Sequence, residues 1–308
     1  MTVEHGEGPT GVADGTWWSR EVRLRLPSPV TELADDRLAR HDVRLLVKRD
    51  DLIHPELPGN KWRKLKHNLL AARQGDFRTL VTFGGAYSNH IRAVAAAGAY
   101  FGFATVGVIR GEPHLPLNPS LAYAVGRGMR LTYLDRADYR DKDAPELLAR
   151  LRSEYGEHYL LPEGGSNSLA VRGCAELPAE ITEPFDVVCV PVGTGGTLAG
   201  VAVGLPPGRS AIGFSALKGG RFLAAEVERL QGAATGSVTA NWRIEHDFHF
   251  GGYARRRPEL DVFAADFATR HGLTLDPIYP AKMMYGIFAL AAAGGFAPGT
   301  TVVAVLTG

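Results

Sequence analysis

Short apolar runs alternate with longer amphipathic stretches along most of this chain. The runs at residues 79–83, 187–192 and 301–306 are apolar or β-branched at nearly every position. Such runs are typical of strands that are buried on both faces of a parallel sheet. Because the stretches between them have the length of helices, the pattern predicts an α/β protein whose parallel sheets are covered by helices.

The expected elements form two successive sets, which predicts two α/β lobes. We expect strands at residues 43–48, 79–83, 105–109, 130–134, 158–161, 187–192, 211–215 and 301–306. We expect helices that begin at Lys61, near Asn89 and after Thr197, and helices over residues 120–125, 144–154, 168–181, 222–230, 260–271 and 281–293.

Length and composition fit this picture and exclude several other classes. A chain of 308 residues is long enough for two domains. Its 34 basic and 33 acidic residues give a net charge of +1, so nothing indicates binding to nucleic acid or to a membrane surface. No apolar run approaches the roughly 20 residues of a membrane helix.

The ends and the cysteines indicate a compartment. Glu4 and Glu7 stand where a signal peptide would be basic and then apolar, and residues 1 to about 15 are expected to form a mobile tail. Cys174 and Cys189 are far apart and in no metal-binding spacing, so we expect two small buried side chains. A reducing cytoplasm is the simplest location.

Lys61 is the first candidate for chemistry. The stretch Pro-Gly-Asn-Lys at residues 58–61 ends an extended segment and opens a helix. A lysine at the positive end of a helix dipole loses some of its preference for the charged form. The uncharged amine is the species that attacks an aldehyde to form a Schiff base. The alternative is that Lys61, Lys64 and their basic neighbours form a solvated helix face.

A glycine-rich loop follows the strand at residues 187–192. Gly193, Thr194, Gly195, Gly196 and Thr197 place successive amides and two hydroxyls at a helix start, which is typical of a phosphate site. A dinucleotide fingerprint would need a third glycine where Leu198 stands, and a P-loop would need a lysine after the glycines. One terminal phosphate is therefore the preferred ligand, and a simple tight turn is the alternative.

A second polar turn follows the strand at residues 79–83. Ser88 lies at a strand-to-helix turn, but His90 stands where a serine-hydrolase elbow needs glycine. The simplest role for Ser88 or Asn89 is therefore a helix cap. The cluster at residues 246–249 contains two histidines in no recognised zinc spacing, so we expect a polar loop there and no metal site.

Together these motifs resemble a family of known enzymes. The chain is similar to the 1-aminocyclopropane-1-carboxylate deaminase and D-cysteine desulfhydrase family, which are fold-type II enzymes dependent on pyridoxal 5'-phosphate (PLP) and are related to the tryptophan synthase β chain. The likeness covers nearly all of residues 28–308. The matching stretches are residues 27–30, 48–51, 59–64, 88–90, 162–167, 193–197, 252–253 and 277–279.

The resemblance implies a cofactor between two lobes. It implies a small lobe at residues 63–165, inserted in a large PLP-binding lobe made of residues 1–62 and 166–308, and a homodimer. Lys61 would carry PLP, Asn89 would bind its phenolic oxygen, and Lys64 would be a further cofactor contact. The amides of residues 193–197 would bind the phosphate.

The resemblance also assigns residues to a small amino-acid substrate. Ser88, Asn89 and His90 would contact the substrate, with Ser88 at its carboxylate or assisting proton transfer. Tyr253 and Tyr279 would flank the substrate as acid/base or orienting groups. These assignments imply an enzyme that releases ammonia and a 2-oxo acid.

One position departs from part of the family and bears on the reaction. The deaminase branch has a glutamate where this chain has Pro280, and the desulfhydrase branch offers hydroxyls to the pyridine nitrogen, a role that Thr307 would take here. We therefore expect β-elimination of the D-cysteine type. Alternatives are cyclopropane ring opening, racemisation, β-replacement, biosynthetic cyclisation, a ligand-binding homologue without turnover, and an NAD-dependent enzyme.

Overall fold

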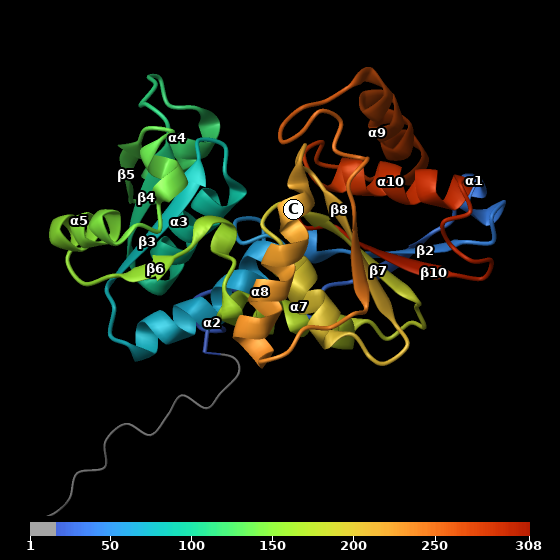
Figure 1. Cartoon of the computed structure of the whole chain (residues 1–308), viewed down its shortest axis with the longest axis horizontal. Helices are drawn as coiled ribbons and strands as arrows, with labels where there is room; N and C mark the ends of the chain where they lie inside the picture. The colour runs from blue at the N-terminus through green and yellow to red at the C-terminus, as the bar shows by residue number, and fades with distance from the viewer. Residues whose placement is uncertain (1–16) are drawn as a thin grey trace, which may run out of the picture.

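The chain forms two parallel sheets that lie side by side, as Figure 1 shows in a computed structural model. The structure describes residues 17–308, so the predicted mobile tail lies outside the described residues. The end of the chain lies between the two sheets (Figure 1). The predicted α/β architecture with parallel sheets is confirmed.

The larger sheet has six strands, five of which run parallel. Its order is β1-β2-β10-β7-β8-β9, and β1 alone pairs antiparallel with its neighbour. The last strand in sequence, β10, pairs with both β2 and β7. The strands are β1 (Val30–Leu33), β2 (Arg44–Lys48), β7 (Val187–Val192), β8 (Ser210–Ser215), β9 (Trp242–Glu245) and β10 (Thr301–Val305).

The smaller sheet has four parallel strands in the order β5-β4-β3-β6. It lies on the other side of Figure 1, with α3, α4 and α5 around it. Its strands are β3 (Thr79–Gly85), β4 (Ala104–Arg110), β5 (Met129–Leu134) and β6 (Tyr159–Leu161).

Ten α-helices connect and cover the strands of the described part of the chain. Between residues 17 and 308 none is long and apolar enough to cross a bilayer. They are α1 (Asp36–Ala39), α2 (Asn60–Gln74), α3 (Asn89–Phe101), α4 (Pro119–Gly126), α5 (Pro145–Tyr155), α6 (Ser168–Ala175), α7 (Gly196–Gly204), α8 (Leu223–Thr235), α9 (Pro258–His271) and α10 (Pro280–Ala292).

Helix α2 connects the two halves of the molecule. Its residues Trp62, Leu65 and Leu69 are fully buried in the same apolar cluster as the inner face of α3. Its opposite side packs against α6, where Gly173 brings the two backbones together, because a Cβ there would lie 1.9 Å from the Arg63 carbonyl oxygen. The start of α2 is thereby fixed between both sheets.

The predicted elements are confirmed with two kinds of difference. The expected helix over residues 168–181 is wrong in its second half, because α6 ends at Ala175 and a separate 3₁₀ turn, Pro178–Glu180, follows. Pro178 has no N–H to continue the helix. Strands β1 and β9 and helix α1 were not predicted, since they are four residues long and carry charged side chains.

Candidate active site

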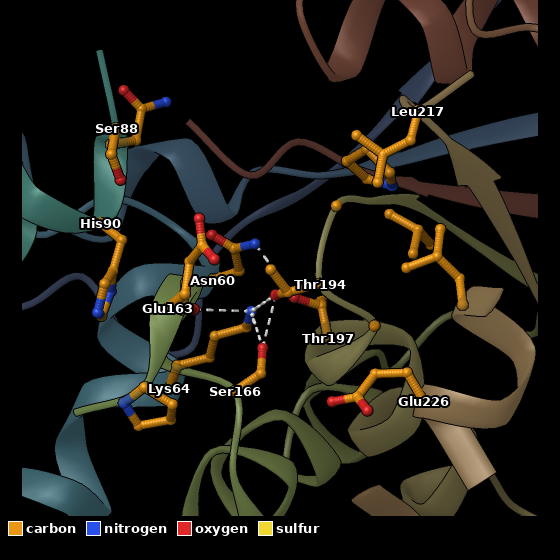
Figure 2. Close-up of a pocket in the computed structure, with 18 of the residues that line it drawn as sticks. Asn60, Lys64, Ser88, His90, Glu163, Ser166, Thr194, Thr197, Leu217 and Glu226 are labelled. Atoms are coloured by element: carbon orange, nitrogen blue, oxygen red, sulfur yellow. Dashed lines mark hydrogen bonds between the residues drawn. The ribbon is translucent and has the colours of Figure 1, made fainter. Parts of the chain in front are cut away.

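A cavity of about 860 Å³ lies between the two sheets. Its walls come from segments that follow the carboxyl ends of β3, β6, β7 and β10, where ligands bind in open parallel sheets. Figure 2 shows Ser88 and His90 on one side of this cavity, with Leu217 and Glu226 on the other. The site therefore draws on both sheets.

Lys61 is held at the second residue of α2. Gly59 precedes the helix at φ 51°, and a Cβ on it would lie 2.1 Å from the carbonyl oxygen of Thr307, so only glycine permits this close approach. The Lys61 amine donates to Asn60 Oδ1 at 2.6 Å. Asn60 in turn donates to the Thr197 hydroxyl at 3.1 Å, which links the lysine to the glycine loop.

The amine of Lys61 has a strongly lowered pKa, at about 7. Removal of water around the amine is the largest cause, and the positive charge of Lys64 adds to it. The sequence predicted a lowered pKa from the helix dipole, whereas burial and a second lysine account for it in the structure. At pH 7 about half of the Lys61 amine is therefore neutral.

The glycine loop begins α7 and faces a buried cation. Lys64 donates to the Ser166 hydroxyl at 3.0 Å, to the Gly164 carbonyl at 3.1 Å and to the Thr194 hydroxyl at 3.4 Å (Figure 2). A Cβ at Gly196 would lie 2.5 Å from the Ser166 hydroxyl, so this glycine leaves room for the contact. Amides at a helix start beside an ammonium are suited to hold a single phosphate.

The turn after β3 supplies the opposite wall. Ser88 is the N-cap of α3 and accepts from the Ile91 amide at 3.3 Å, so its predicted capping role is confirmed. Asn89 is the first residue of the helix and lines the cavity. The Ser88 hydroxyl keeps its proton for another acceptor, because the cap uses it only as an acceptor.

His90 is buried and neutral. Its Nε2 lies 2.9 Å from the Thr82 hydroxyl, which donates to the Leu161 carbonyl, so Nε2 must carry the proton. Burial, with the charges of Lys61 and Lys64, holds the pKa of His90 well below its usual value. A neutral His90 can fix the position of the turn after β3 through its hydrogen bond with Thr82. It carries no positive charge with which to bind a carboxylate.

Two tyrosines, Tyr253 and Tyr279, line another part of the cavity. The rings of Tyr253 and Tyr279 lie 6.0 Å apart and edge to face, and burial raises the pKa of both phenols. Both are therefore protonated over the physiological range. Thr307, which follows β10, is 3% exposed and lines the same cavity.

The structure brings nearly all the predicted site residues together. Of those named from the sequence, Gly196 alone does not line the cavity, and it packs behind it against Ser166. Sequence reasoning assigned no role to several further wall residues, which are Asn60, Arg110, Lys142, Asp143, Glu163, Ser166, Leu217, Phe222, Glu226 and Arg229. The stretch at residues 162–167 could have been predicted to line the cavity, because it follows a strand and is rich in glycine. The sequence of α8 contains no comparable motif.

The donor set fits PLP. A neutral lysine amine suits an aldehyde, while the amides of residues 193–197 with Lys64 suit a doubly charged phosphate. A Cβ at Gly193 would lie 3.0 Å from the Tyr279 hydroxyl, so glycine at this position lets Tyr279 lie close to the loop. The cavity also has ample volume for a small amino acid beside the cofactor.

Comparisons with known proteins identify the family and its cofactor. The family described as "Pyridoxal-phosphate dependent enzyme" matches residues 24–308. A Pyrococcus furiosus protein provisionally named 1-aminocyclopropane-1-carboxylate deaminase is 33% identical over 264 residues, covering 81% of this chain and 80% of the relative. A D-cysteine desulfhydrase of Klebsiella pneumoniae (strain 342) is 30% identical over 295 residues, covering 87% and 88%.

A solved structure agrees as well. The crystal structure of an ACC deaminase homologue superposes with a TM-score of 0.82 at 26% identity, covering 93% of this chain and 90% of that one. The architecture and these matches point the same way. The chain belongs to the pyridoxal-phosphate-dependent enzymes of fold type II, in the group that holds the 1-aminocyclopropane-1-carboxylate deaminases and D-cysteine desulfhydrases.

Proposed function

We propose that this enzyme carries out β-elimination on a small amino acid of the D-cysteine type and releases ammonia, a 2-oxo acid and the β-substituent. The observation that carries this proposal is that Pro280 begins α10 directly after Tyr279, so no carboxylate side chain stands at this position. Relatives named for desulfhydration and for cyclopropane deamination both support a deaminating lyase of this group.

Each wall of the cavity has a task in this proposal. When bound, PLP supplies an electron sink that stabilises negative charge at the substrate α-carbon. Lys61 would hold the cofactor and, when displaced by the substrate amine, would move a proton at the α-carbon. Its pKa of about 7 lets the amine accept and release a proton near neutral pH.

The remaining side chains orient the reactants. The Ser88 hydroxyl and the start of α3 would receive the substrate carboxylate, and Asn89 would contact the phenolic oxygen of PLP. Tyr253 and Tyr279, both protonated, would donate to the substrate or to its leaving group. Thr307 would contact the ring nitrogen.

A threonine in the proposed contact with the ring nitrogen would favour elimination over ring opening. A threonine hydroxyl cannot keep a pyridine nitrogen protonated as a carboxylate can, so the electron sink is weaker. Opening a cyclopropane depends on a strong sink. Expelling a thiol or chloride from the β-carbon demands less, since these are good leaving groups.

Two product assays on the purified enzyme test this proposal. We expect pyruvate from D-cysteine or a β-chloroalanine to form faster than 2-oxobutanoate from 1-aminocyclopropane-1-carboxylate. Faster release of 2-oxobutanoate would contradict the argument from Pro280. Absence of turnover with any amino acid, despite bound PLP, would support a ligand-binding homologue. An amino acid of inverted configuration would indicate a racemase, and one with a new β-substituent would indicate β-replacement.

The assembly is part of the same proposal. Residues 63–165 would form the small lobe and the rest of the chain the large one, which is supported by the position of β3 to β6 within residues 79–161. We propose a homodimer in a reducing cytoplasm. Buried Cys174 and Cys189, both free thiols, are consistent with that compartment.

A further inference from the structure

A buried lysine outside the cavity contacts the segment that carries Tyr253. Lys282 is on α10, only three residues after Tyr279, and is 1% exposed. Its amine donates to the carbonyl oxygen of Gly252 at 2.8 Å. Gly252 is the residue that precedes Tyr253. Helix α10 therefore begins directly after Tyr279 and also contacts the backbone that carries Tyr253.

The segment that carries Tyr253 has an unfavourable backbone. Phe250 and Ala254 have φ values of 52° and 55°, in the left-handed region that side chains rarely adopt, and Gly251 and Gly252 also have positive φ. A tight turn forms where the Arg255 amide donates to the Gly252 carbonyl at 3.1 Å. Such a conformation persists only where its surroundings fix it.

Helix α10 contacts this segment at several points, and the rings of Phe248 and Tyr285 lie 6.4 Å apart. The ring of Phe250 packs edge to face on Tyr285 at 4.9 Å between centroids, and the Lys282 amine binds the Gly252 carbonyl. Burial lowers the pKa of Lys282 to about 8, so keeping an amine here is costly. An apolar side chain of similar length would fill the same space without that cost, which indicates that the hydrogen bond has a task.

We propose that Lys282 is a positioning residue that holds the segment at residues 246–257 on α10 and so sets the Tyr253 hydroxyl against Tyr279. This inference rests on the proposed function of the tyrosines. Lys282 does not line the cavity, and it acts through the Gly252 carbonyl alone. A displacement of about 1 Å at an acid/base group can cost roughly 100-fold in rate.

Lys282→Met is the direct test. Lys66→Met is its control for the general effect of removing a buried lysine amine. Lys66, on α2, is also a buried lysine and pairs with Glu176. We expect Lys282→Met to lower kcat at least tenfold with KM within about threefold, and to leave the absorbance of Lys61-bound PLP unchanged. In the Tyr253→Phe background the same change should have little further effect. An equal loss in both backgrounds would overturn the proposal.

Hydrogen exchange supplies a readout that needs no turnover. In Lys282→Met we expect faster amide exchange at residues 246–257 and unchanged exchange in β10, whereas general destabilisation would speed both. Unchanged exchange at residues 246–257 would overturn the proposal. If Lys282→Met fails to fold, Phe250→Leu weakens a second contact between the segment and α10 and should give the same pattern in milder form.

The two proposals can fail separately. If the wild-type enzyme releases no 2-oxo acid from any amino acid, the proposed function fails, while the exchange experiment still decides whether Lys282 holds the segment. If turnover is present and the segment exchanges normally in Lys282→Met, the positioning role alone is wrong.

Discussion

The amine of Lys61 is held by Asn60 and shares its cavity with a second buried cation, Lys64. With a pKa of about 7, its uncharged fraction is nearly complete one pH unit above neutrality. We expect cofactor-free protein to capture PLP at a rate that rises with pH to about 8 and then levels off. An unperturbed lysine, with a pKa of about 10.4, would give a rate that still rises beyond pH 9.

Stopped-flow absorbance measures this rate, and borohydride reduction with peptide mapping locates the label. We expect the pyridoxyl group on Lys61 and none in Lys61→Ala. A label on Lys64 would contradict the assignment. We expect none there, because the Lys64 amine already donates hydrogen bonds to Ser166 and Gly164.

Ser88 has a structural role that must be separated from a catalytic one. Loss of its cap in Ser88→Ala costs typically about 1 kcal/mol of stability. Loss of a group that contacts the substrate or moves its proton costs roughly 100-fold or more in rate. We expect both effects, measured by denaturant unfolding and by kcat/KM, with Ser88→Thr retaining the cap and part of the activity. Full activity in Ser88→Ala would show that Ser88 acts only as the N-cap of α3.

At the scale of elements, α2 is fixed by a buried group of charges beneath the site. Arg63 donates to Asp50 at 2.6 and 2.8 Å and to Glu180 at 2.8 Å, and both Arg63 and Asp50 are almost fully buried. Arg63→Met would leave Asp50 buried without its cation. We expect a loss of about 3–5 kcal/mol in the free energy of unfolding.

An exposed pair supplies the control for this change. Arg270 donates to Asp266 at 3.0 Å from a surface position on α9. Arg270→Met should cost no more than about 1 kcal/mol, because exposed ion pairs contribute little. Similar losses for both variants, in urea unfolding, would show that burial of the charges at Arg63 is unimportant.

Local patterns predicted the elements and motifs better than they predicted what surrounds them. Residues 193–197 and Lys61 stood out because glycine-rich loops and helix starts are encoded by adjacent residues. Ser166 and Asn60 have roles only through contacts with Lys64, Thr197 and other partners far along the chain. The edge strands β1 and β9 depend on their neighbouring strands for their structure, so four residues were too few to predict them.

At the scale of the molecule, the buried charges make stability depend on acidity. Burial alone would raise the pKa of Glu180, but hydrogen bonds from Arg63 and Lys48 prevail and hold it at about 2, below its usual 4.5. A carboxyl with a lowered pKa contributes stability above the unfolded pKa and loses it as pH falls toward the folded pKa.

Acid unfolding checks this dependence. Between pH 4.5 and 2 we expect Glu180 to account for a fall of at most about 1.4 kcal/mol per pH unit. In Glu180→Gln this contribution should vanish, giving a shallower fall of the melting temperature in the same interval and a lower value at pH 7. Parallel curves for the two proteins would show that Glu180 is not coupled to folding.

The central place of β10 has a consequence for biosynthesis. Because this strand joins β2 to β7, the ribosome must have released residues 301–305 before the large sheet can close. The small sheet and the apolar side chains that pack with it come from residues 17–161, so this half can form on the nascent chain much earlier. Lys61 would then remain on a half-supported helix until Thr307 arrives beside Gly59. Translation products that stop before β10 would therefore present an unclosed large sheet to chaperones and proteases.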